Sequence, residues 1–81
     1  MARVSGKADA DQSLRRLGQA IRSRREVAGL SQEALADAAQ IDRSHMGKIE
    51  RGERNVTLLN LLKIAVAMDC PASEVMAAAG L

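Results

Sequence analysis

Cationic and small polar side chains are concentrated on one side of a short segment, residues 43–51. A helix there, turning about 100° per residue, places five residues on its outward face: Arg43, Ser44, Gly47, Lys48 and Arg51. Met46, Ile49 and Glu50 face the other way. Long cationic donors reach guanine N7 and O6 or phosphate oxygens, and small residues permit close approach to a duplex. This pattern favours insertion into the DNA major groove, although a solvated helix face can have the same composition.

Two short helices joined by a tight turn must position that face. Ser31 is a favoured N-cap for the first helix, because its hydroxyl can accept a hydrogen bond from a first-turn N–H. Asp42 is the N-cap candidate for the second helix, where its negative charge suits the positive end of the helix. Gly52 is suited to the left-handed position that follows a helix. The spacing therefore predicts a helix-turn-helix over about residues 31–52.

Residues 30–55, LSQEALADAAQIDRSHMGKIERGERN, resemble the helix-turn-helix of the Cro/repressor-type, XRE-like family of bacterial and phage regulators. The resemblance extends over about residues 14–75, and the sequences DRS and GERNVT are most similar to controller proteins of restriction-modification systems. It implies an all-α, compact five-helix, lambda-repressor-like DNA-binding domain. Gln40 stands where the family usually has glycine, and a left-handed backbone there would cost glutamine roughly 1 kcal/mol more than glycine.

Four side chains of the second helix are expected to contact bases. Arg43 would bind guanine through two hydrogen bonds, and Ser44 and Lys48 would contact the neighbouring bases. His45 stands where the resembling controller proteins often have an aromatic residue that touches DNA, and it could make a weaker version of that contact.

The residues that flank this helix are expected to contact the DNA backbone or the minor groove. Gln32, in the first turn of the preceding helix, would bond a phosphate, and Arg51 and Asn55 would brace the backbone. Arg54 could reach toward the minor groove. In the resembling controller proteins, the residues that match Arg54 and Asn55 contact DNA.

Arg25 and Glu50 are the expected structural ion pair. Arg25 falls on the inward side of a helix expected over residues 14–28, one turn after Ile21, where a cation needs a partner. Glu50 is the only acid on the inward side of residues 43–51. By resemblance, the matching residues of the family form a buried pair that holds the first helix against the recognition helix.

Apolar spacing predicts three further helices, over residues 14–28, 58–68 and 72–79. Ser13 and Thr57 are the N-cap candidates for the first two, and Pro71 can be the first residue of the last. The residues expected to form the inward stripes are Leu14, Leu17, Ile21 and Ala28 in the first helix, Leu35 with Ala38 or Ala39 in the second, and Leu58, Leu61, Leu62, Ala65 and Val66 in the fourth. Leu59 and Ile64 remain for a second contact.

Residues 72–79 are the expected dimerisation helix, because the family commonly forms a two-fold interface with its C-terminal helix. The residues expected to contribute to the interface are Leu59, Val75, Met76 and Leu81. A dimer places two recognition helices about one DNA turn apart, ~34 Å, and implies a pseudo-palindromic site. The alternative is that these residues complete the core of a single chain.

The composition limits the other possibilities. The 81 residues include no Phe, Tyr or Trp, which argues against single-strand recognition by aromatic stacking and leaves an aliphatic core. The net charge is only +2, but the cations are concentrated between residues 15 and 54, and only Lys63 follows Asn55. Residues 1–12 are expected to be a disordered arm, and residues 13–81 to be one domain.

No residues have the spacing of a catalytic or metal site. His45 is the only histidine and Cys70 the only cysteine, so no metal, no cofactor and no enzyme activity are expected. The sequence has no apolar run of ~18 residues and no charged-then-apolar leader, which predicts a cytoplasmic protein with no membrane contact.

The sequence therefore favours a dimeric, sequence-specific regulator of transcription that binds double-stranded DNA, with RNA polymerase as a further partner. Among such regulators, a restriction-modification controller protein is preferred to a phage-type repressor or an antitoxin. The alternative from another class is a protein-interaction module that keeps the fold without reading DNA.

Overall fold

The computed structural model describes residues 12–81, which form five α-helices and contain no strand. The helices are α1 (Ser13–Val27), α2 (Gln32–Ala38), α3 (Arg43–Glu50), α4 (Leu58–Ala67) and α5 (Ala72–Ala78). The predicted all-α, five-helix architecture is confirmed. The arm predicted for residues 1–12 lies outside the described residues except for Gln12.

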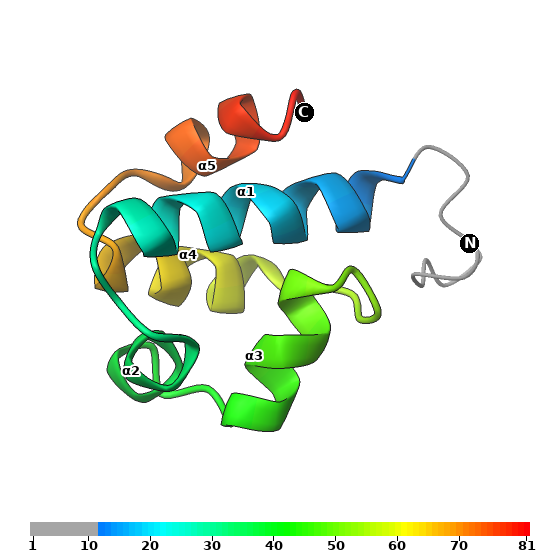
Figure 1. The fold of residues 1–81 in the computed structure, drawn as a ribbon. Helices are drawn as coiled ribbons and strands as arrows, with labels where there is room; N and C mark the ends of the chain where they lie inside the picture. The colour runs from blue at the N-terminus through cyan, green and yellow to red at the C-terminus, as the bar shows by residue number, and fades with distance from the viewer. Residues whose placement is uncertain (1–11) are drawn as a thin grey trace.

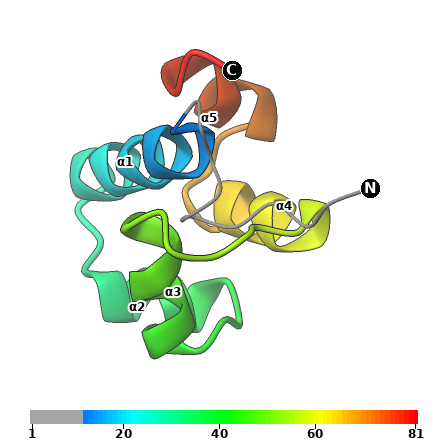
Figure 2. The same cartoon turned by 90° about the vertical axis from the view of Figure 1, so that its right-hand side faces the viewer.

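The longest helix, α1, lies between α5 on one side and α2 and α3 on the other (Figure 1). The perpendicular view in Figure 2 again places α5 and α3 on opposite sides of α1. Helix α1 packs against α2, α3 and α5, and α4 packs against α2 and α5. Helix α3 is thus held from behind by α1 and α2, while its other side faces away from the bundle.

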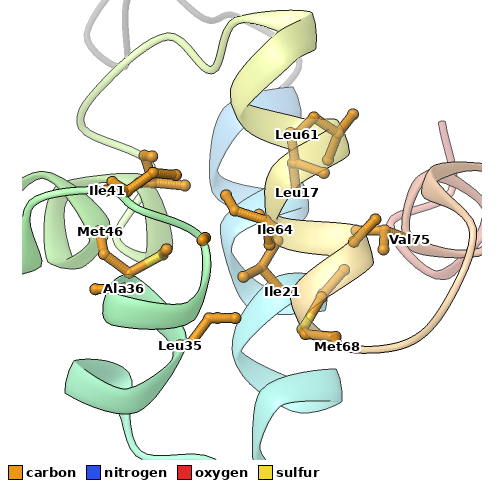
Figure 3. Close-up of a cluster of buried hydrophobic side chains, with 14 of the residues drawn as sticks. Leu17, Ile21, Leu35, Ala36, Ile41, Met46, Leu61, Ile64, Met68 and Val75 are labelled. Atoms are coloured by element: carbon orange, nitrogen blue, oxygen red, sulfur yellow. The ribbon is translucent and has the colours of Figure 1, made fainter.

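A single aliphatic core joins all five helices (Figure 3). The largest fully buried side chains are Ile21, Leu35, Met46, Ile49, Ile64 and Val75. These six residues come from every one of the five helices, so each helix contributes to the same core. The core contains only aliphatic residues and methionine, as the absence of aromatic residues requires.

The predicted inward face of α4 is confirmed at Leu61 and Ala65 and is wrong at the exposed Leu58, Leu62 and Val66. The buried residues are Leu61, Ile64, Ala65 and Met68, which have the i, i+3, i+4, i+7 spacing of one helix face. The exposed residues are Leu58, Leu59, Leu62 and Val66. Because the sequence of α4, LLNLLKIAVA, is apolar on nearly every side, its periodicity cannot select the buried face. Packing against α2 and α5 makes that selection.

Two other predictions about burial are corrected. Ala28 is exposed, because it follows the end of α1. Of the two alternatives given for α2, Ala39 is the buried residue and Ala38 is exposed. Val75 is fully buried in the core of its own chain, which removes its side chain from the predicted dimer interface.

The predicted N-caps of α2, α3 and α4 are confirmed. Each cap side chain accepts a hydrogen bond from the backbone N–H three residues later, at 3.0 Å for Ser31, 3.3 Å for Asp42 and 3.1 Å for Thr57. These bonds satisfy first-turn N–H groups that have no partner inside the helix.

Ser13 and Pro71 differ from their predicted positions. The N-cap of α1 is Gln12, with φ 60°, so Ser13 already belongs to the helix and its hydroxyl cannot take the cap position. Pro71 is the N-cap of α5 rather than its first residue, because its extended ψ of 147° places it before the helix. Gln40 and Gly52 are left-handed as predicted, with φ 58° and 75°.

Two arginines of α1 fix α5 in place. Arg16 donates from Nε to the Ala79 carbonyl at 3.0 Å and from Nη2 to the Gly80 carbonyl at 2.7 Å. Carbonyl groups at the end of a helix have no partner within it, so these bonds act as a C-terminal cap. Arg24 forms an ion pair with Glu74 in the first turn of α5.

Gly18 lies where α1 packs directly against the backbone of α3. A Cβ atom at this position would lie 2.4 Å from the Glu50 carbonyl oxygen and 2.5 Å from that of Ile49. Both oxygens belong to the backbone of α3, so neither can be moved by a change of rotamer.

Gly18→Ala should therefore destabilise the fold by at least about 1–3 kcal/mol, the range for inserting extra atoms into a packed interior. Urea unfolding followed by circular dichroism at 222 nm measures the change. Gln19→Ala, at the exposed neighbouring position of α1, is the matched control and should unfold like the wild type. Equal midpoints for both variants would contradict the close contact between α1 and α3.

Candidate nucleic-acid interface

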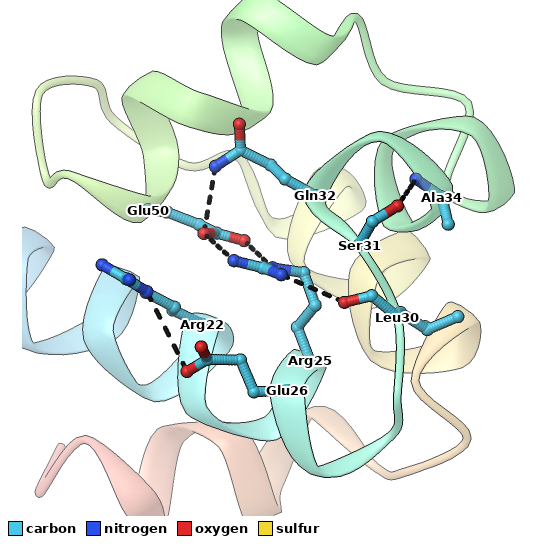
Figure 4. Close-up of polar contacts among 8 residues, drawn as sticks. All are labelled: Arg22, Arg25, Glu26, Leu30, Ser31, Gln32, Ala34 and Glu50. Atoms are coloured by element: carbon cyan, nitrogen blue, oxygen red, sulfur yellow. Dashed lines mark hydrogen bonds and ion pairs between the residues drawn. The ribbon is translucent and has the colours of Figure 1, made fainter.

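The Glu50 carboxylate at the end of α3 is buried and receives three hydrogen bonds (Figure 4). Arg25 donates from Nε to Oε2 at 2.7 Å and from Nη2 to Oε1 at 3.0 Å. Gln32 donates from Nε2 to the same Oε1 at 3.1 Å. The side chains of Arg25 and Glu50 are only 12% and 3% exposed. The expected ion pair is present, and Gln32 is an additional donor that the sequence did not reveal.

Arg25 also contacts the connection between the first two helices, because its Nη1 donates to the Leu30 carbonyl at 3.0 Å. The hydrogen bond to Glu50 raises the pKa of Arg25 above its ordinary value, and burial opposes that increase. The guanidinium therefore stays protonated and joins α1, the start of α2 and the end of α3. The orientation of α3 depends on this junction.

Arg25→Met keeps the aliphatic stem of the side chain and removes the charge, which leaves the Glu50 carboxylate buried without its main donor. We expect a loss of about 3–5 kcal/mol in the free energy of unfolding at neutral pH. Arg22→Met is the matched control, since the 3.9 Å pair of Arg22 with Glu26 is exposed and should contribute no more than about 0.5 kcal/mol. Urea titrations distinguish the two, and equal stabilities would show that the pair is dispensable.

The outward face of α3 carries the residues predicted to contact bases. Arg43 and Ser44, in the first turn, are exposed, and His45 and Lys48 are half-buried. A shallow groove of about 370 Å³ runs along this face, lined by Gln32, Arg43, Ser44, Gly47 and Arg51. The structure thus brings two predicted base-contacting residues and two predicted backbone-contacting residues to one groove.

Gly47 forms part of this groove because it has no side chain. A Cβ atom there would lie 3.1 Å from Arg51 Nη1 and 3.3 Å from Gln32 Oε1. The side chains of Gln32 and Arg51 therefore extend toward each other over the backbone of α3. A larger residue at position 47 would displace one of them.

Arg51, the C-cap residue of α3, is paired with Glu53, which sequence reasoning did not select. Its Nε donates to Glu53 Oε2 at 2.9 Å and its Nη2 to Oε1 at 3.4 Å. This hydrogen bond raises the pKa of Arg51 and lowers that of Glu53, and the charges of Lys48 and Arg54 lower the latter further. The signal available in the sequence was that Glu53 lies between Arg51 and Arg54 and is the second of only two acids in residues 43–54.

The two remaining predicted contacts, Arg54 and Asn55, are exposed in the loop between α3 and α4. They follow α3 in the chain but do not line the groove along it. Within residues 12–81, no three His, Cys, Asp or Glu side chains form a group that could hold a metal ion. The helices of this part of the chain are also too short or too polar to cross a bilayer.

The order of the helices and the exposed cationic face of α3 define a small helix-turn-helix protein. A family model described as helix-turn-helix matches residues 21–75, more than half of the chain. The chain belongs to this helix-turn-helix family.

Three similar proteins are controller or regulator proteins. The chain is 38% identical over 65 residues to control protein C.SmaI of Serratia marcescens, across 80% of this chain and 77% of that protein. The crystal structure of the restriction-modification controller protein C.AhdI from Aeromonas hydrophila is 48% identical with a TM-score of 0.75, across 76% and 94% of the two chains. The clp gene regulator ClgR from C. glutamicum is 26% identical with a TM-score of 0.81, across 84% and 88%. The resemblance to controller proteins is confirmed.

Proposed function

We propose that this protein is a sequence-specific DNA-binding regulator of transcription, the controller protein of a restriction-modification system, acting as a dimer on a pseudo-palindromic operator. The observation that carries the proposal is the two-sided character of α3: Ile49 and Glu50 are buried, while Arg43 and Ser44 are exposed at its start. Similarity to C.SmaI and C.AhdI favours the controller role over a phage-type repressor or an antitoxin. A controller that activates transcription would also contact RNA polymerase.

The first turn of α3 is the proposed base-reading element. In helix-turn-helix proteins the N-terminal residues of the recognition helix contact base edges in the major groove. Arg43 would donate to guanine O6 and N7, and Ser44, His45 and Lys48 would contact the adjoining bases. Arg43 has no hydrogen bond or ion pair among the interactions described for residues 12–81, so its guanidinium can reorient without breaking one.

The proposed backbone contacts surround this element. Gln32 gives one amide N–H to Glu50 and keeps the other for a phosphate oxygen. Arg51 would contribute a further phosphate contact beside the same groove. Arg54 and Asn55 would contact the backbone or the minor groove from the adjoining loop, where both are exposed.

Selection of bound fragments from a random duplex library at moderate salt tests the proposal. The wild type should enrich a pseudo-palindromic motif, and Arg43→Ala should weaken binding to it by about 5- to 150-fold and relax one base position, as expected for loss of a bidentate contact worth about 1–3 kcal/mol.

Arg24→Gln is the control for that experiment, because it removes one cation on the side of α1 that contacts Glu74 of α5. It should retain the wild-type motif. If the wild type enriched no motif, the protein-interaction alternative would be preferred. An identical motif for wild type and Arg43→Ala would rule out Arg43 as a reader.

Helix α4 supplies the apolar surface that we propose for dimerisation. Four of the six large hydrophobic residues exposed within residues 12–81 belong to it: Leu58, Leu59, Leu62 and Val66. A groove of about 330 Å³ lies between three of them and the end of α2. Leu59 thus stays in the proposed interface, as do the exposed Leu81 and the half-buried Met76. A second copy of the chain is the proposed occupant, because two-fold pairing presents two recognition helices to one operator.

Leu59→Lys should place two like charges in such an interface and weaken dimerisation at least about tenfold. Sedimentation equilibrium without DNA measures the change. Val27→Lys introduces the same charge at a residue of α1 that is 90% exposed, and it should dimerise like the wild type. A monomeric wild type, or equal dimerisation of both variants, would contradict the proposed surface.

A further inference from the structure

The Glu53 carboxylate lies among three cations at the end of α3. It is bonded to Arg51 through both of its oxygens, and the positive charges of Lys48 and Arg54 act on it as well. The side chains of Arg51 and Glu53 are 58% and 53% exposed, so the pair is in contact with solvent. No part of the proposed DNA contact requires an acid at this position.

A carboxylate and a phosphate bind an arginine in the same way. Each presents two oxygens that accept parallel hydrogen bonds from the guanidinium. Glu53 uses the Nε and Nη2 donors of Arg51, while Nη1 lies over Gly47 in the groove of α3. A DNA phosphate that approaches the Nε/Nη2 edge of Arg51 must therefore displace Glu53, and it also experiences the repulsion of the displaced carboxylate.

We propose that Glu53 is an internal competitor of DNA phosphate, which occupies Arg51 in the free protein and holds DNA affinity below the value that the surrounding cations would give. This inference rests on the proposed DNA-binding function. Glu53 acts on a backbone contact, which is the same for every sequence. Glu53 therefore lowers the affinity for every DNA sequence. As a result, the base contacts of α3 account for a larger share of the affinity for the operator.

Binding of a random-sequence duplex pool by wild type and Glu53→Gln, at 50 and 200 mM salt, tests this inference. Glu53→Gln should bind more tightly at both concentrations. Because one more phosphate is neutralised, the slope of log K against log salt should steepen by ~0.9, so that the gain at 50 mM exceeds the gain at 200 mM about three- to fourfold.

Two controls separate occupancy of Arg51 from a general charge effect. Asp69→Asn removes the same charge in the turn after α4, at an exposed residue with φ 55° that asparagine tolerates, and it should leave the slope unchanged. In an Arg51→Met background, Glu53→Gln should no longer steepen the slope.

Equal or weaker binding by Glu53→Gln would overturn the inference, and weaker binding would instead make Glu53 a residue that positions Arg51. The same gain with and without Arg51 would overturn occupancy as the mechanism. If neither the wild type nor the variants bound the duplex in a salt-dependent way, the proposed function would fail together with this inference. If the wild type bound the duplex and Glu53→Gln bound it with the same affinity and salt dependence, only this inference would fail.

Discussion

The burial of one carboxylate constrains the whole arrangement. Glu50 is the last residue of α3, where the helix dipole disfavours negative charge, and its side chain is 3% exposed. A charge in that position is tolerated only when donors surround it. Arg25 of α1 supplies two donors and Gln32 of α2 supplies a third, so three helices are joined at one point. The position of the cationic face follows from that junction.

Two glycines allow the helices and side chains around this junction to come close together. Gly18 lets α1 approach the backbone of α3, and Gly47 lets Gln32 and Arg51 extend over the other side of the same helix. Gln32 belongs to both regions, because its amide nitrogen bonds the buried Glu50 and its side chain lines the exposed groove. The geometry of the groove is therefore set mainly by buried contacts, and the loop after α3 adds only the pair between Arg51 and Glu53.

Local sequence patterns were sufficient to predict the helix-turn-helix. They were not sufficient to predict the long-range contacts and the burial of the residues around it. The caps at Ser31 and Asp42 depend on residues three positions apart, which a sequence displays directly. The Arg25–Glu50 pair joins residues 25 positions apart, and the resemblance to a family was needed to suggest it. The buried face of α4 could not be selected, because apolar residues such as Leu62 and Ile64 occur on both sides of that helix. Glu53 was missed because its contact crosses a turn, where helical periodicity does not apply.

The contacts of Arg16 and Arg24 with α5 and the residues after it affect the order in which the chain folds during synthesis. Arg16 bonds carbonyl groups 63 and 64 residues later, at Ala79 and Gly80. Helix α1 leaves the ribosome before the other four helices but cannot complete its contacts until these residues have followed. Closing so long a loop costs entropy that is repaid only when α5 docks. Until then the side of α1 that packs against α5 is uncovered, and the contacts of Arg16 and Arg24 can form only after residues 74–80 have been synthesised.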